Sequence, residues 1–282
     1  MYKRQSSSMF IISLAISAII FFQMGLYLLS IVAGWDVGYN LVVVCHGWMR
    51  TIGLSSLEYV LDAFVVYTLL VTSWKIGSQL YYASRMKKRF EQYKENGLSI
   101  EMNQTYSNGE DEFIVISHPS PLAITMGFVQ PKIVLSTGLI SLLNNGELKA
   151  VISHEMYHKE NKDPFNIFLM SLCSSTMWYL PILKWFNQNY RIMKELLADE
   201  YAIEKQETSV NLGSALLKML KVSKNQKMPF AYASFADTSV NYRIDYILNP
   251  VREIQIKLPL IVTLMSLTIF SLICALFIYA LA

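Results

Sequence analysis

The sequence contains few charged residues and few of the side chains that bind metal ions. Only 16% of its 282 residues are Asp, Glu, Lys or Arg, whereas 53% are hydrophobic. An ordinary soluble domain carries about 25% charged residues, so this composition excludes that class and predicts an integral membrane protein. The chain has only four histidines, so a regular spacing between two of them is informative.

Cysteine provides neither a disulfide framework nor a metal site in this sequence. Cys45, Cys173 and Cys274 are scattered through apolar segments and have no metal-like spacing. An odd number of cysteines in such positions predicts free thiols. Internal repeats and low-complexity tracts are also lacking, which excludes a repeat architecture.

The apolar residues are concentrated in blocks that are long enough to span a bilayer. The first block, 9–33, is nearly uncharged and has no cleavage site of the secretory type, so we predict a retained anchor. A second predicted span, 57–82, contains Asp62 and Lys75, which should snorkel or line a protein interior. The third predicted span, 258–282, contains no charged residue.

Lysine and arginine predict the orientation of the chain. Lys3 and Arg4 precede the first span and a basic cluster follows the second, whereas the connecting loop contains only Arg50. The positive-inside rule therefore predicts a multi-pass protein of the cell membrane, with a cytoplasmic N-terminus and the C-terminus outside. The net charge of +3 has this topological explanation, so direct binding of nucleic acid is not expected. The predicted domains are an N-terminal membrane region with two transmembrane helices (1–84), a cytoplasmic domain (85–257) and a C-terminal transmembrane helix (258–282).

Two of the histidines carry the strongest chemical signal. His154 and His158 are four residues apart, and Glu155 follows the first of them directly. Positions i and i+4 of a helix share one face, so both imidazoles can hold one Zn²⁺ while Glu155 acts as the catalytic base. The preceding segment, 146–152, has an acidic first turn and apolar residues at helical spacing, which predicts such a helix. This residue set is the minimum for hydrolysis of a peptide bond.

A catalytic zinc ion needs a third protein ligand from a separate element. Glu195 and Asp199 lie one turn apart in a segment of helical periodicity, 190–202. We assign Glu195 as the third zinc ligand and Asp199 as the acceptor of an imidazole N–H, which would determine the tautomer of that histidine. The alternative is that both are ordinary solvated carboxylates. We interpret Asp163, which precedes Pro164, as a capping or surface charge.

The apolar block 164–186 conflicts with a simple transmembrane interpretation. His154 and His158 precede it and Glu195 follows it, so one crossing would separate the ligands, and the block is too short to cross twice. We therefore predict a membrane-associated helix that is re-entrant, interfacial or buried in protein, with a break near Pro181, unless the zinc itself lies at membrane depth. Either arrangement brings the active site close to the membrane.

A small β-sheet is predicted between the second span and the histidines. The segments 111–116 and 132–136 have the composition of short strands. The connecting segment, 117–130, should form a sheet edge or a loop beside the site, and an exposed edge can hold a peptide in extended form. A purely structural sheet is the alternative. The polar stretch 91–109 is predicted to be a linker or loop.

A family resemblance follows from these motifs. The segments 121–139, 147–158, 162–163 and 195–199 resemble, in this order, the metallopeptidase domain of BlaR/MecR-type antibiotic-sensing signal transducers. The similarity extends over roughly 112–248 and is most specific at the zinc motifs. It implies a mainly α-helical membrane protein with a small β-sheet and a gluzincin-type zinc peptidase domain between transmembrane helices. It also implies cleavage of the chain itself or of a cytoplasmic repressor-type DNA-binding protein when a signal arrives.

The chain departs from that family in one respect. It ends at Ala282, directly after the last predicted span, whereas the best-known members carry an extracellular penicillin-binding sensor domain. Sensing of β-lactams by that route is therefore not expected. A signal would enter through the loop 35–57, through the spans or through a partner protein.

A neighbouring family supplies the alternative function. The membrane proteases of the HtpX type share the zinc motifs, but carry a His-Pro pair ahead of an Arg-Ile step that here reads Arg243-Ile244 without the pair. The alternatives are therefore an HtpX-like quality-control or peptide-processing protease and a receptor without catalysis. Arg243 and Tyr242 are candidate stabilisers of the transition state; a structural salt bridge and a packed aromatic ring are the competing interpretations.

Overall fold

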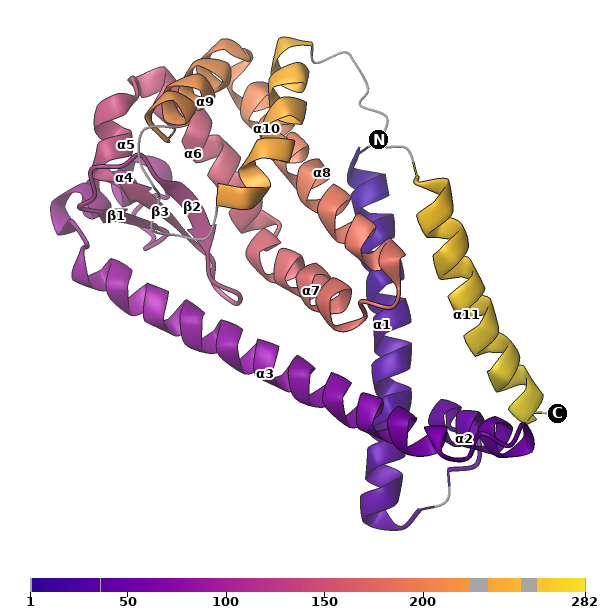
Figure 1. Cartoon of the computed structure of the whole chain (residues 1–282). Helices are drawn as coiled ribbons and strands as arrows, with labels where there is room; N and C mark the ends of the chain where they lie inside the picture. The colour runs from indigo at the N-terminus through magenta and orange to yellow at the C-terminus, as the bar shows by residue number, and fades with distance from the viewer. Residues whose placement is uncertain (1, 36, 224–232, 250–257, 282) are drawn as a thin grey trace. The chain divides into compact units, whose positions relative to one another are not determined.

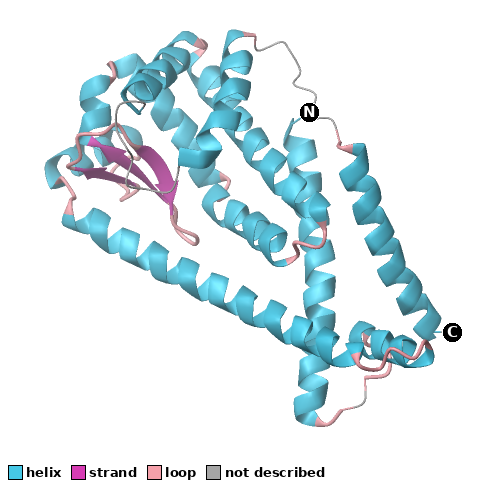
Figure 2. Cartoon of the chain, viewed as in Figure 1, coloured by secondary structure: helices cyan, strands magenta, loops and turns pink. Residues whose placement is uncertain are grey.

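The computed structural model describes residues 2–35, 37–223, 233–249 and 258–281. These residues are mainly helical and fall into two compact units, which are coloured along the chain in Figure 1 and by secondary structure in Figure 2. We call the first the mixed unit, because it contains the β-sheet; it comprises Met1–Ser7, Tyr81–Phe168 and Asn189–Ile256. The helical unit comprises Ser8–Leu80, Leu169–Gln188 and Lys257–Ala282.

The sheet of the mixed unit has three short strands, β1 (Phe113–Ile116), β2 (Ala123–Met126) and β3 (Lys132–Ser136). β3 lies in the centre, pairs in parallel with β1 and in antiparallel with β2, and leaves β2 at an edge. The two strands expected at 111–116 and 132–136 are therefore confirmed, and the connecting segment supplies the edge strand. Gly127 turns the chain out of β2 with a φ of +110°, where a Cβ would lie 2.9 Å from the carbonyl oxygen of Gln130.

The helix with the histidine motif packs against this sheet. α6 (Asn145–Glu160) begins with a capping box, in which the side chains of Asn144 and Glu147 each bind the backbone N–H of the other. The predicted helix around the motif is confirmed. Its apolar face joins α5 (Thr137–Leu142), α9 (Val210–Ser223) and the sheet in one core. The fully buried members of this core include Phe113, Val115, Ile133, Leu135, Leu139, Ile152 and Ala215.

The prediction of a linker or loop over 91–109 was wrong, because most of this stretch forms helix α4 (Asn96–Tyr106). Asn103 on this helix is buried and pairs with β1, donating to the Phe113 carbonyl at 3.0 Å and accepting from its N–H at 2.8 Å. Leu98, Met102 and Tyr106 pack on the core at a spacing of four residues. Asn103 is therefore a polar residue of a packed helix, whose side chain pairs with the backbone at the edge of β1 and not with water.

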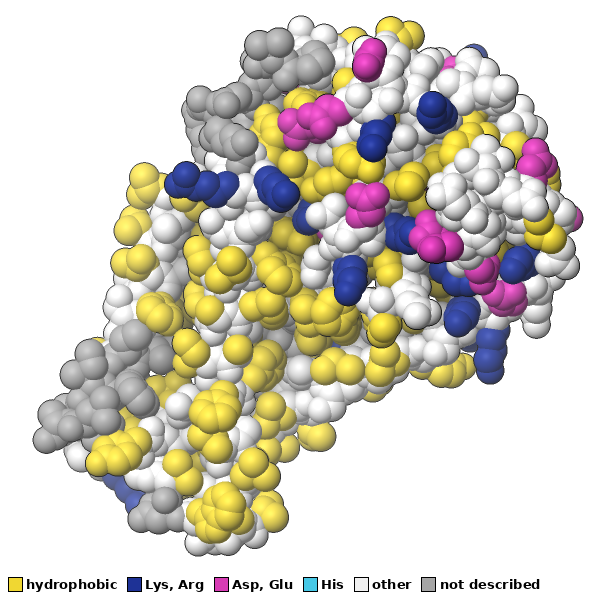
Figure 3. Space-filling view, turned by 180° about the vertical axis from the view of Figure 1, so that it is seen from behind, with side chains coloured by type: hydrophobic (Ala, Val, Ile, Leu, Met, Phe, Trp, Pro, Cys, Tyr) yellow, Lys and Arg dark blue, Asp and Glu magenta, His cyan; other side chains and the backbone are white. Residues whose placement is uncertain are grey.

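Two described helices are long and apolar enough to span a membrane, α1 (Tyr2–Ala33) and α3 (Leu57–Gln92). Within the helical unit, residues of both contribute to one apolar core with α2 (Leu41–Thr51). α11 (Leu260–Leu281) lies within the predicted third span. The face in Figure 3 shows apolar side chains covering the helices of this unit, whereas Lys, Arg, Asp and Glu gather on the mixed unit. A surface of this kind is expected where lipid is the solvent.

The apolar block 164–186 is divided between two helices. α7 (Asp163–Thr176) forms its first part, and α8 (Pro181–Gln206) begins at the proline where a break was expected. Proline suits the first turn of a helix because it has no backbone N–H to leave unpaired. The chain therefore turns between Thr176 and Pro181 before α8 continues to Glu195.

Candidate metal centre

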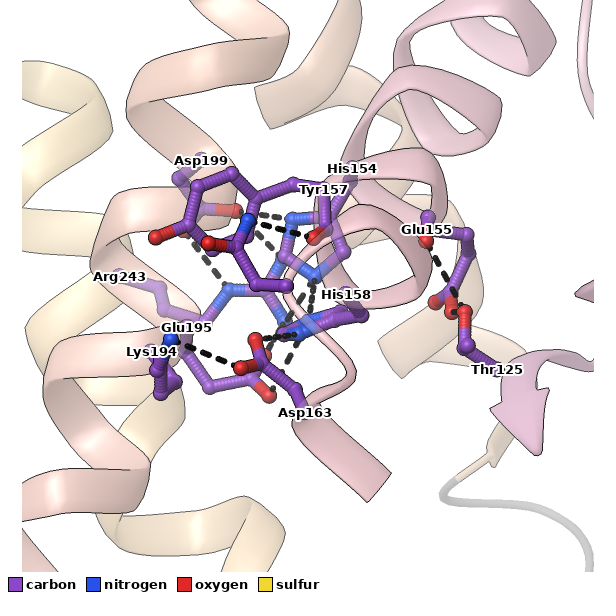
Figure 4. A network of polar contacts seen from close by, with 11 residues as sticks. Thr125, His154, Glu155, Tyr157, His158, Asp163, Lys194, Glu195, Asp199 and Arg243 are labelled. Atoms are coloured by element: carbon purple, nitrogen blue, oxygen red, sulfur yellow. Dashed lines mark hydrogen bonds and ion pairs between the residues drawn. The ribbon is translucent and has the colours of Figure 1, made fainter. Parts of the chain in front are cut away.

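Three predicted ligands converge in the mixed unit (Figure 4). His154 and His158 project from α6 with their Nε2 atoms 3.2 Å apart. Glu195 projects from α8, with its oxygens 3.5 Å from Nε2 of His154 and 3.7 Å from Nε2 of His158. Ligands of a tetrahedral zinc ion at 2.0–2.1 Å lie about 3.3 Å from one another. The three side chains therefore fit a metal ion of this size with little adjustment.

The burial of these side chains is uneven. His154 and His158 are 6% and 8% exposed, because α6 is covered on the face that carries them. The side chain of Glu195 remains 27% exposed. A catalytic metal site keeps one position open for water or substrate, and the exposure of Glu195 shows that solvent reaches this side of the cluster.

Asp199 lies behind His154, one turn beyond Glu195 on α8. Its Oδ1 is 2.8 Å from Nδ1 of His154, and the carboxylate is completely buried. Arg243, on α10 (Ala233–Leu248), donates to both oxygens of Asp199 at 2.8 Å through Nε and Nη2. Its Nη1 also lies 3.1 Å from Glu195. The contacts of Arg243 are thus those of a salt bridge to two carboxylates of the site.

The charges of this cluster alter its proton affinities. Burial raises the pKa of Glu195, but the hydrogen bond with His154 and the charge of Arg243 outweigh it, so the net pKa is lowered. Burial likewise opposes ionisation of Asp199, yet Arg243 and His154 hold its pKa below the usual range. For His154, burial and Arg243 lower the pKa, whereas contacts with Asp199 and Glu195 raise it to about 9. Both carboxylates are therefore anions, and a metal ion competes with a proton for the imidazole.

Asp163 is part of this centre, so its interpretation as a capping or surface charge was wrong. It is 1% exposed, and its Oδ2 lies 2.9 Å from Nδ1 of His158. Its Oδ1 lies 2.8 Å from Nζ of Lys194, which is itself buried. Lys162, with a φ of +51°, turns the chain so that the first residue of α7 faces back to the motif. An acidic residue just beyond the end of a histidine helix is the signal that could have found it.

Glu155, the predicted base, lies on the side of α6 that faces the sheet. It is 8% exposed, and the hydroxyl of Thr125 on β2 lies 2.7 Å from its Oε2. Sequence reasoning placed this segment beside the site but did not single out Thr125. Tyr242 is 39% exposed, and none of the described contacts joins it to the ligands.

A helix with two histidines and a glutamate base, completed by a carboxylate from a second helix, is the arrangement of metal-dependent peptidases. Comparison with known proteins agrees. Residues 49–247, more than half of the chain, match the family described as BlaR1 peptidase M56, so the chain belongs to this family of metallopeptidases. The resemblance to BlaR/MecR-type proteins is confirmed.

One relative indicates how far the likeness extends. Over 129 residues the chain is 26% identical to the regulatory protein BlaR1 of Bacillus licheniformis. The alignment covers 44% of this chain and 21% of that protein, so the chain spans about a fifth of the relative it matches. Together with the two apolar helices α1 and α3, these similarities indicate a membrane-associated peptidase.

Proposed function

We propose that this protein is a membrane-embedded zinc metalloendopeptidase that acts as a regulated signalling protease. It would cleave itself, a cytoplasmic repressor-type DNA-binding protein, or both. The observation that carries the proposal is the convergence of His154, His158 and Glu195, with Glu155 next to His154 on α6. The placement in the cell membrane, with the N-terminus and the peptidase domain cytoplasmic and the C-terminus outside, follows from the basic residues of the sequence.

The donor set favours zinc. Two imidazole nitrogens and one carboxylate oxygen form a common ligand set of catalytic zinc, and His154, His158 and Glu195 would hold the ion. When bound, zinc supplies a Lewis acid that polarises the scissile carbonyl and lowers the pKa of water. Glu155 would take the proton of the attacking water and deliver it to the leaving amine. The edge of β2 that no described strand pairs with would hold the substrate backbone in extended form.

The surrounding residues have supporting roles in this proposal. Asp199 and Asp163 would accept the Nδ1 protons of the two histidines, which leaves both Nε2 atoms free for the ion. Arg243 would keep Asp199 and Glu195 ionised and oriented. Tyr242 remains a candidate hydrogen-bond donor to the oxyanion, which its replacement by phenylalanine would test.

The division of roles can be tested on the purified full chain by measuring bound zinc and peptide cleavage together. Glu155→Gln should retain zinc and lose cleavage by about 10²–10⁴-fold, because the base contacts the reacting water and not the metal. Glu195→Gln should lose much of its zinc. Glu204→Gln, an exposed position on the same helix as Glu195, is the matched control and should retain both properties. Equal loss of zinc in the first two variants would contradict the assignment.

The signalling role has a separate test, a comparison of the protein N-termini in cells that express the wild type or Glu155→Gln. Cleavage of one or two proteins, among them this chain or a DNA-binding repressor, supports a signalling protease. Cleavage of many membrane proteins without an inducer would favour the HtpX-like alternative.

A further inference from the structure

The hydrogen bonds between β2 and β3 determine which backbone groups of β2 point to its other edge, which no described strand pairs with. The N–H of Ser136 donates to the carbonyl of Leu122 at 2.9 Å. Hydrogen-bonded and non-hydrogen-bonded pairs alternate along an antiparallel ladder, so Ile124 is the next bonded position. The backbone N–H and C=O groups of Ala123 and Thr125 therefore face away from β3, at the edge where a peptide would bind.

The side chain of Thr125 faces a different direction from its backbone groups. In Figure 4 it extends from β2 toward Glu155 on α6. The hydroxyl oxygen lies 2.7 Å from Oε2 of Glu155 and 3.0 Å from its backbone carbonyl oxygen. A hydroxyl group has one proton, and the shorter contact assigns it to the carboxylate. Threonine is branched at Cβ and stiff at χ1, so the position of this hydroxyl follows the position of the strand.

We propose that Thr125 is a positioning residue for Glu155, through which a peptide on the β2 edge orients the catalytic base. The peptide would bond to the backbone of Thr125 and hold β2 in place. The hydroxyl of the same residue then holds Oε2, so that Oε1 is the carboxylate oxygen left to accept the proton of the attacking water. This inference rests on the proposed peptidase function and extends it to substrate docking.

A purely structural role for Thr125 makes different predictions. In that case the hydroxyl would only tie β2 to α6 through the Glu155 carbonyl, and its loss would lower stability and disturb the zinc ligand next to Glu155. Thr125→Val preserves the shape and the branched Cβ but removes the donor. Thr125→Ser keeps the donor. The pair therefore separates the hydrogen bond from the packing.

The experiment measures kcat, KM, bound zinc and melting temperature for the zinc-loaded full chain in lipid nanodiscs, with fluorescein-labelled β-casein as substrate. For Thr125→Val we expect kcat to fall about 10–100-fold, as for other groups that hold a reacting residue in place. KM should stay within about twofold, and zinc content and melting temperature should not change, because the ligands are untouched. Thr125→Ser should restore most of kcat. Thr105→Val, an exposed position on α4, is the control.

The outcomes test the positioning role of Thr125 separately from the proposed peptidase function. A wild-type kcat in Thr125→Val, with Glu155→Gln inactive, overturns the role of Thr125 and leaves the peptidase function intact. If Thr125→Val loses activity and also binds less zinc or melts at a lower temperature, the role of Thr125 is structural and the positioning role is overturned. Failure of Thr125→Ser to restore kcat overturns the positioning role as well. If neither β-casein nor the chain itself is cleaved in a zinc-dependent way by the wild type, both proposals fall.

Discussion

The two histidines of the metal centre differ in how they are supported. On one side, Nδ1 of His154 contacts Asp199, and Arg243 binds both oxygens of that carboxylate. The same guanidinium reaches Glu195, so one cation connects a supporting carboxylate to a predicted ligand. Arginine suits this position because its planar fork of donors is always charged.

On the other side, Nδ1 of His158 contacts Asp163, which is paired with Lys194 through one contact of 2.8 Å. The ammonium group of Lys194 also lies 5.6 Å from the ring centroids of both Tyr157 and Tyr190. Lysine is a compact charge without a fork, and none of its described contacts reaches another ligand.

The difference shows that compensating the charge of a buried carboxylate and orienting a metal ligand are separate functions of the two cations, Arg243 and Lys194. Both sides compensate a buried carboxylate with a cation, which a buried anion requires. Only the His154 side also orients a ligand from another helix. Variants of the two cations should therefore differ in what they do to zinc binding.

Arg243→Met should have the largest effect, because it leaves Asp199 and Glu195 without their shared cation. We expect zinc affinity to fall about 10–100-fold, the usual cost of removing a residue that holds a metal ligand in place. The unfolding free energy should fall by about 3–5 kcal/mol, as for other broken buried pairs. Zinc competition against a chromophoric chelator and chemical denaturation measure the two effects. Arg243→Lys, which keeps the charge without the fork, should be intermediate; wild-type affinity in Arg243→Met would refute a role in the site.

Lys194→Met should have a smaller effect on zinc. Methionine keeps most of the apolar stem between the two tyrosine rings but leaves Asp163 without its cation. We expect a loss of affinity of up to about tenfold, since only the support of His158 is weakened. The same chelator competition measures it, with Lys184→Met at an exposed position of α8 as control. A loss as large as that of Arg243→Met would remove the distinction between the two sides.

Glu147→Gln, at the opposite end of α6 from the metal ligands, should change stability but not zinc affinity. Burial raises the pKa of Glu147, but hydrogen bonds from Lys218, Ser214 and the backbone of Asn144 outweigh it and lower the pKa to about 2. A carboxylate with a lowered pKa stabilises the folded state above its ordinary pKa of 4.5, and this stabilisation is lost as the pH falls toward 2.

The melting temperature of Glu147→Gln should therefore be a few degrees lower than that of the wild type at neutral pH, with the gap closing below pH 4.5. Thermal unfolding across this pH range measures it. Zinc affinity at neutral pH should stay within about twofold of the wild type, because the three predicted ligands and the side chains that contact them are unchanged. A constant gap across the pH range would mean that the ionised form of Glu147 contributes no stability.

The parts of this molecule that the sequence predicted correctly depend on patterns among residues close together in the chain. The helix around His154, the two strands at 111–116 and 132–136 and the apolar helices all follow from periodicity, capping residues and composition. The stretch 91–109 failed because its polar residues are used by a distant strand, as Asn103 shows. Composition alone does not distinguish a polar side chain that is hydrated from one that forms hydrogen bonds with the backbone of a strand.

The sequence by itself determined that two imidazoles share one helix face with a glutamate between them, since that geometry depends only on the 3.6-residue turn. Tertiary structure decided which side chains support them. Asp163 and Lys194 are 31 positions apart and meet only because α7 and α8 fold back toward α6, and Thr125 reaches Glu155 only because α6 packs against β2. Contacts of this kind arise from the packing of elements distant in the chain, which periodicity does not encode.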